Sequence, residues 1–212
     1  MEPAEHADRL RPVVPGLVRW GVAQRRIGGA RGESYAILSG EGQILVDPLP
    51  LTPAALERLA ARGPVRAIVL TIQSHQRSAW RYRRRFQAPV YAPSGSQGLD
   101  ERPDHAYRAG GGLPGGLRAM ALPGPAFSEH GILWRSPAGT VAFVGDLVTR
   151  AGRELSFVPD RYMDSPGKAR ASVRELARRR IDVLCPGHGA PLLGAVKARL
   201  ERLLAADARG HG

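Results

Sequence analysis

The sequence predicts a layered α/β protein, and three observations support this prediction. The chain has 212 residues, 43% hydrophobic and 24% charged, which is enough to build a substantial core. Short segments typical of strands fall into two groups, and helical segments lie between and after them. No low-complexity linker divides the chain, so we expect a single domain over residues 1–212. Residues 1–15, rich in charge and proline, are expected to form a loosely packed N-terminal segment.

The first half of the chain predicts strands followed by helix–strand pairs. A turn at Gly40-Glu41-Gly42 joins two strands of a hairpin that ends at Asp47. Thr52 and Pro53 provide an N-cap and a first-turn proline for a helix that ends near Gly63. We expect strands over 17–24, 34–39, 43–46, 67–70 and 89–92, and a second helix over 78–86.

The second half repeats the pattern of strands and helices. The glycine-rich segment 108–117 predicts a loop, and it lacks the Gly-Lys-Ser/Thr of a phosphate-binding loop. Ser165 and Pro166 predict the start of a helix that carries Val173 and Leu176. We expect strands over 118–122, 131–135, 140–144 and 181–184, and an amphipathic helix over 192–206.

The composition limits the function classes. One cysteine excludes a disulfide framework, and the absence of a signal peptide or a long apolar run predicts a cytoplasmic protein without a membrane span. The formal charge of +12 and the arginine-rich segment 77–85 leave nucleic-acid binding possible. Helical spacing explains that segment equally well as a solvated helix face, with Trp80 and Tyr82 turned toward the core, and we favour this interpretation.

Three strand ends carry polar residues that could perform chemistry. Thr71-Ile72-Gln73-Ser74-His75 follows one strand, Gly145-Asp146 ends another, and Gly187-His188-Gly189 follows the last. Binding sites of α/β proteins lie at the carboxyl ends of strands, so we expect these segments to meet. Each motif alone is weak, because Asp after Gly often forms a turn and a single His is often structural.

Together these motifs resemble the metallo-β-lactamase superfamily over nearly the whole chain. The matching segments are Ile44-Leu45-Val46-Asp47, Leu70-Thr71, Pro123-Gly124-Pro125, Gly145-Asp146 and Gly187-His188-Gly189. The resemblance implies a four-layer αββα sandwich with two metal ions in a cleft between the sheets, where a small molecule binds. The segment 155–164 further resembles a bacterial branch whose metal loop has the form Thr-x-x-x-His-x-Arg, which Thr71, His75 and Arg77 match.

The departures from the family pattern concern the metal ligands. The family's loop reads His-x-His-x-Asp-His after the threonine, where this chain has Ile72, Ser74, Gln76 and Arg77. A one-residue insertion would bring His75 to the second histidine, Arg77 to the aspartate and Ser78 to the last histidine. Pro125 replaces a further histidine, for which His130 is a conceivable substitute, although a solvent-facing strand residue is the favoured interpretation of His130.

The remaining ligands suggest at most one metal ion. His75, Asp146 and His188 form a set that suits zinc or iron at low occupancy, with Asp47 supporting them from behind. Without a metal, we expect Arg77 or His75 to pair directly with Asp146, with Arg77 replacing the lost positive charge. The expected function is a protein that is non-catalytic or of altered chemistry. The alternative is a mononuclear hydrolase of an ester, thioester, lactone or phosphodiester that uses these three residues.

Overall fold

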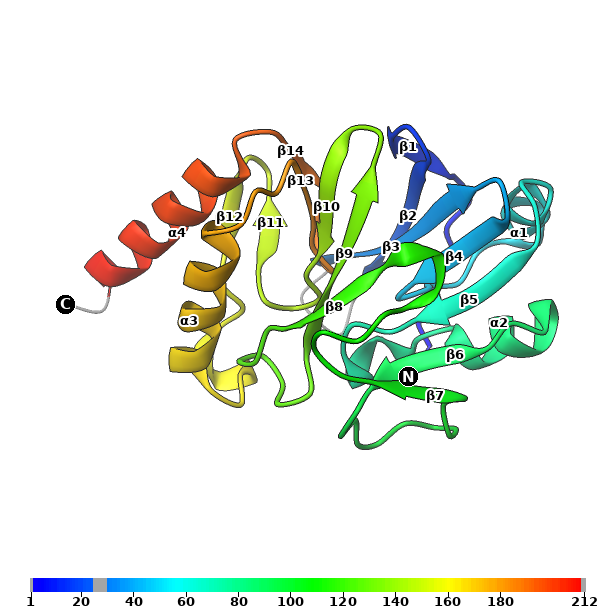
Figure 1. Cartoon of the computed structure of the whole chain (residues 1–212), viewed down its shortest axis with the longest axis horizontal. Coiled ribbons are helices and arrows are strands. Elements are labelled where there is room, and N and C mark those ends of the chain that lie inside the picture. Colours follow the sequence, from blue (N-terminus) through cyan, green and yellow to red (C-terminus); the bar gives the residue numbers. More distant parts are fainter. Residues whose placement is uncertain (1, 25–29, 211–212) are drawn as a thin grey trace.

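Two β-sheets stack face to face, and helices cover both outer faces, in the computed structural model of the chain (Figure 1). The structure describes residues 2–24 and 30–210. The helices are α1 (Pro53–Ala60), α2 (Ala79–Phe86), α3 (Pro166–Ala177) and α4 (Val196–Gly210), and the 3₁₀ turn η2 (Gln73–Gln76) precedes α2. Within these ranges no helix is both long and apolar enough to cross a membrane.

The first sheet has seven strands in sequential order. It consists of β1 (Arg11–Val14), β2 (Leu17–Gln24), β3 (Ala30–Ser39), β4 (Gly42–Val46), β5 (Val65–Val69), β6 (Val90–Pro93) and β7 (His105–Tyr107). Strands β1 to β4 are antiparallel, and β4 to β7 are parallel. In the parallel part, α1 connects β4 to β5 and α2 connects β5 to β6, as is usual for βαβ units.

The second sheet has the order β14-β13-β10-β9-β8. It consists of β8 (Arg118–Ala121), β9 (His130–Ser136), β10 (Gly139–Phe143), β13 (Val183–Cys185) and β14 (Leu192–Leu193), and β11 (Thr149–Ala151) and β12 (Glu154–Ser156) form a separate ribbon. Only the pair β10 and β13 is parallel. Parallel pairs in the two sheets, β4/β5 and β10/β13, therefore supply the strand ends that carry the candidate residues.

Three apolar clusters confirm the predicted αββα layering. One packs α1 and α2 against the outer face of the first sheet, and another packs α3 and α4 against the second sheet. The third lies between the sheets, where Tyr35 meets Phe143 edge to face with 5.2 Å between ring centroids. Tyr35 also donates a 2.7 Å hydrogen bond to Pro186 O, which joins β3 to the end of β13.

The predicted elements match the structure except at a few places. Thr52 caps α1 as expected, whereas the side chain of Ser165 makes no capping hydrogen bond. Leu192 and Leu193 were predicted to begin the last helix but form β14, and α4 starts at Val196. The short strands β1, β7, β11 and β12 were not predicted, because three or four residues carry too little periodicity.

The described part of the N-terminal segment, residues 2–15, makes backbone contacts with the rest of the fold, and its loose packing stays a prediction. Ala7 is buried, donates to Pro50 O and accepts from the Thr52 backbone, at 2.9 Å each. Residues 11–14 form β1 at the edge of the first sheet. A strand edge and a loop thus pair with backbone groups of this segment, while most of its side chains stay at least partly exposed.

Phe143→Ala should remove about 3–5 kcal/mol from the free energy of unfolding, because Phe143 is fully buried between the sheets. Urea denaturation of the two proteins measures this difference. Phe127→Ala is the matched control, because this phenylalanine is 77% exposed. Equal losses for both variants would contradict the assigned packing.

Candidate metal centre

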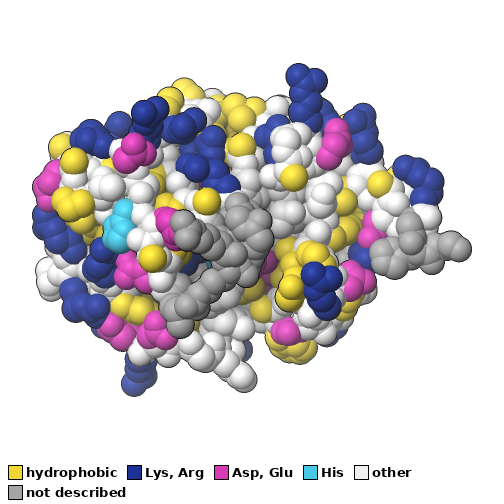
Figure 2. Space-filling view, turned by 180° about the vertical axis from the view of Figure 1, so that it is seen from behind, with side chains coloured by type: hydrophobic (Ala, Val, Ile, Leu, Met, Phe, Trp, Pro, Cys, Tyr) yellow, Lys and Arg dark blue, Asp and Glu magenta, His cyan; other side chains and the backbone are white. Residues whose placement is uncertain are grey.

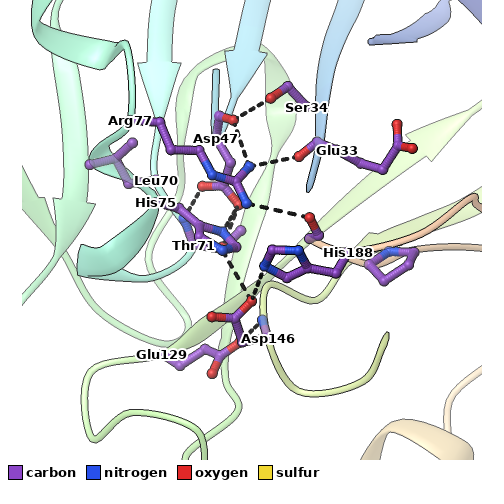
Figure 3. Close-up of polar contacts among 12 residues, drawn as sticks. Glu33, Ser34, Asp47, Leu70, Thr71, His75, Arg77, Glu129, Asp146 and His188 are labelled. Carbon is purple, nitrogen blue, oxygen red and sulfur yellow. Dashed lines mark hydrogen bonds and ion pairs between the residues drawn. The ribbon is translucent and has the colours of Figure 1, made fainter. Parts of the chain in front are cut away.

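Three of the predicted site residues come together at the junction of the two sheets (Figure 3). His75 lies in η2, just beyond β5, whereas Asp146 follows β10 and His188 follows β13. One ligand atom from each residue lies within 4.8 Å of those of the other two. Strand ends from both sheets thus bring together three segments that the sequence analysis expected to meet.

Asp146 Oδ1 is the point on which both imidazoles converge. His75 Nε2 lies 3.0 Å and His188 Nε2 lies 3.2 Å from this oxygen. Despite these distances, His75 Nε2 and Asp146 Oδ1 are buried without a hydrogen bond of good geometry among the described residues. Buried polar atoms without a hydrogen bond need an explanation, and a bound ion or a water molecule would provide one.

Asp47 fixes the orientation of His75 from the opposite side. Its Oδ2 accepts from His75 Nδ1 at 2.9 Å and from Thr71 Oγ1 at 2.6 Å, and its Oδ1 accepts from Thr71 N at 2.8 Å. A carboxylate only accepts, so His75 Nδ1 carries a proton and Nε2 faces Asp146. This is the arrangement in which a carboxylate orients a metal-binding histidine.

Arg77 lies in the interior but does not bind the Asp146 carboxylate. Its Nη1 donates to Glu33 O at 2.7 Å and to Asp47 O at 3.1 Å, and its Nη2 donates to Gly187 O at 3.3 Å. Of the two partners expected for Asp146, the direct contact is therefore with His75. The role of Arg77 as a charge replacement stays a prediction.

Glu129 is a buried residue of this region that sequence reasoning missed. Its Oε1 accepts from Asp146 N at 2.6 Å and from Leu147 N at 3.1 Å. Gly145 has a φ of +51°, and a Cβ there would lie 2.4 Å from Glu129 Oε1, so only glycine fits this turn. An acidic residue just before a strand usually lies on the surface, and the sequence carried no signal that this one is buried.

The ionisable groups of the site have shifted pKa values. Burial would lower the pKa of His75, as would the charge of Arg77, but Asp146 and Asp47 raise it above its usual value. Burial would raise the pKa of Asp146, but the charge of His75 and the contact with His188 hold it well below its usual range. Burial lowers the pKa of His188 and raises that of Glu129 well above its usual range. In the metal-free protein, these two shifts favour a protonated His75 next to an ionised Asp146.

Other positions of the family's metal loop have structural partners. Gln76 Oε1 accepts from Trp80 Nε1 and from Asp100 N, both at 2.7 Å, and Ser78 Oγ donates to Glu2 Oε1 at 2.6 Å. His130 begins β9 but does not face solvent as expected, because it is buried with its Nδ1 2.8 Å from Ser128 O. It lies outside the three-residue group.

The arginine-rich helix α2 is a paired surface helix. Arg81 pairs with Glu2, Arg83 and Arg84 pair with Glu101, and Arg85 pairs with Glu57. Trp80 and Tyr82 are buried, so the expectation that they turn inward is confirmed. On the face shown in Figure 2, Lys and Arg side chains are spread out with acidic side chains among them.

The fold and the matching motifs agree with a family-level comparison. The model of the metallo-beta-lactamase superfamily matches residues 14–207, so the chain belongs to this superfamily. No functionally curated protein matches the sequence.

Solved metallo-beta-lactamases share the fold at low sequence identity. DIM-1 metallo-beta-lactamase exposed to ceftazidime is 14% identical, with a TM-score of 0.77, and the match covers 97% of this chain and 100% of that one. FIM-1 from Pseudomonas aeruginosa in its mono-zinc form is 16% identical, with a TM-score of 0.74 and coverage of 96% and 97%. The enzyme from Erythrobacter litoralis is 18% identical, with a TM-score of 0.72 and coverage of 96% and 95%.

The raised pKa of His75 predicts a pH-dependent contribution to the stability of the metal-free protein. Because folding strengthens proton binding, this contribution is complete below the unfolded pKa of about 6.5 and is lost as pH rises through the folded pKa. The stability difference between wild type and His75→Gln should thus be larger at about pH 6 than at about pH 9. Urea denaturation with a chelator measures it. A difference that grows with pH would contradict the assigned charge state.

Proposed function

We propose that this chain binds one divalent metal ion, zinc or iron, through His75, Asp146 and His188, and uses it in hydrolytic chemistry on a small molecule. The observation that supports this is the convergence of three ligand atoms within 4.8 Å, with His75 Nε2 and Asp146 Oδ1 lacking hydrogen bonds among the described residues. The superfamily's two-metal site is largely lost, because Ile72, Ser74 and Pro125 stand at former ligand positions.

The spacing of the ligand atoms suits a single ion. Two ligands at about 2.05 Å from a tetrahedral zinc lie about 3.4 Å apart. The two imidazole nitrogens lie 3.0 and 3.2 Å from Asp146 Oδ1, which is close to this separation. Three protein ligands also leave the open position that hydrolytic sites need. The similar FIM-1 enzyme, described in a mono-zinc form, is consistent with one ion in this fold.

The protein's own residues prepare the site for an ion. Asp47 holds His75 with Nε2 toward Asp146, and Glu129 fixes the turn that carries Asp146 by accepting two backbone N–H groups. When bound, the ion supplies a Lewis acid that polarises a carbonyl or phosphoryl oxygen and makes water more acidic. The Asp146 side chain is 22% exposed, although its Oδ1 is buried. An ester, thioester, lactone or phosphodiester fits this chemistry, and Arg77 adds a positive charge where a second ion is lost.

A second candidate is a non-catalytic protein that binds a small molecule at the same place. The contacts of His75 with Asp47 and Asp146 favour it, because a protonated His75 neutralises part of the acidic charge without a metal. The protein as isolated would then hold little metal. The two candidates differ in whether added zinc binds to the group.

Metal analysis separates the two candidates. After incubation with zinc and gel filtration, the wild type should retain about one ion per chain, and His188→Ala should retain far less, because a ligand is missing. Elemental mass spectrometry gives the ratio. His130→Ala is the matched control, since this buried histidine lies outside the group and should leave zinc binding unchanged.

Hydrolysis of a simple ester, thioester, lactone and phosphodiester by the zinc-loaded protein then tests catalysis. Asp146→Asn should abolish any metal-dependent rate. Wild-type protein that holds no more zinc than His188→Ala would contradict the metal site and favour the ligand-binding candidate. Zinc binding without hydrolysis of any substrate would contradict the hydrolase assignment alone.

A further inference from the structure

Arg77 is a buried cation whose hydrogen bonds join three segments of the chain. Its side chain reaches Glu33 O in β3, Asp47 O at the end of β4, and Gly187 O in the turn after β13 (Figure 3). The residue is 5% exposed, so water contributes little to its hydrogen bonding. A buried guanidinium that donates to carbonyls of both sheets fixes the separation of those sheets at this point.

Two of the three carbonyls belong to backbone that carries the candidate ligands. Asp47 orients His75 through its carboxylate, and Gly187 directly precedes His188. The approach is close, because a Cβ on Gly187 would lie 2.4 Å from His75 Cε1. A movement of either backbone segment would therefore change the distance between the two imidazoles.

The backbone on both sides of this contact is strained. Asp47 has a φ of +49° and Arg77 a φ of +36°, a region that residues other than glycine rarely adopt. Such conformations persist where the surrounding contacts fix them, and they cluster at functional sites. Here Arg77 Nη1 and Asp47 O form a hydrogen bond to each other, so the two strained residues are linked.

We propose that Arg77 is the positioning residue that sets the spacing between His75 and His188 for binding a metal ion. It acts on His75 through Asp47 and on His188 through Gly187. Its hydrogen bonds within the described residues go to backbone carbonyls and not to either imidazole. The inference rests on the metal site proposed above. Lysine cannot replace Arg77, because one ammonium on a flexible stem cannot reach three carbonyls in a fixed fork.

Arg77→Lys keeps the charge and removes the fork, so it tests the positioning role. We expect the variant to fold and to bind zinc about 10–100-fold more weakly than wild type, as is usual when a residue supporting metal ligands is lost. Competition with a chromogenic chelator measures the zinc affinity, and circular dichroism measures folding. The absorption spectrum of the Co²⁺-loaded protein, which reports ligand geometry, should change as well.

Arg170→Lys is the matched control. Arg170 is also a well-covered arginine, with 14% side-chain exposure, but it lies on α3 and pairs with Asp160, which precedes α3, and with Asp207 of α4. This variant should leave the zinc affinity and the Co²⁺ spectrum unchanged. A folded Arg77→Lys with wild-type zinc affinity would overturn the proposal. Failure of Arg77→Lys and Arg77→Gln to fold, while Arg170→Lys folds, would overturn it in favour of a purely structural role.

A metal-free measurement separates this inference from the proposed function. If wild-type protein binds no zinc, the proposed metal site fails, and ¹⁵N-histidine NMR spectra of the metal-free proteins still test the positioning role. Arg77→Lys should then shift the ring signals of both His75 and His188, because the positions of both rings depend on the hydrogen bonds of Arg77. Ring signals that match wild type would overturn the inference.

Discussion

The carboxylate and carbonyl of Asp47 hold the site together. The carboxylate accepts from Thr71 and His75, and the carbonyl accepts from Ser34 at 2.5 Å and from Arg77. One residue at the end of β4 thereby links β3, the segment after β5 and the interior arginine. Burying a carboxylate costs free energy unless it is fully hydrogen-bonded, and these contacts meet that requirement. The orientation of His75, and with it the whole candidate centre, depends on this arrangement.

The buried cationic groups of the site bind two different kinds of acceptor. Acidic side chains of the candidate centre face the imidazoles, whereas Arg77 binds only backbone carbonyls among the described residues. The guanidinium therefore leaves the Asp146 carboxylate to the two imidazoles. A direct Arg77–Asp146 pair would have occupied the carboxylate that the proposed metal site needs. This separation explains how an interior cation and a candidate metal-binding group can occur together.

Much of the fold could be predicted from the sequence, because long periodic segments and turn residues indicate strands, helices and turns within short stretches of the chain. The hairpin around Gly40, the capped helix α1 and the strand ends at Asp146 and His188 are all of this kind. The hydrogen-bond partners of Arg77 could not be predicted, because they are backbone carbonyls, and every residue has one whatever its side chain. The burial of Glu129 was missed for a related reason, since its partners are the backbone N–H groups of Asp146 and Leu147.

The meeting of two parallel strand pairs from different sheets has a consequence for folding. Arg77 and Gly187 are 110 residues apart in the chain, and Tyr35 and Pro186 are 151 residues apart. Contacts of such long range close large loops, and their entropic cost is recovered only when both halves are formed. Neither half of the chain alone contains the centre. An intact centre is therefore a marker of complete folding, and a partly folded or truncated chain lacks it even where each sheet has formed.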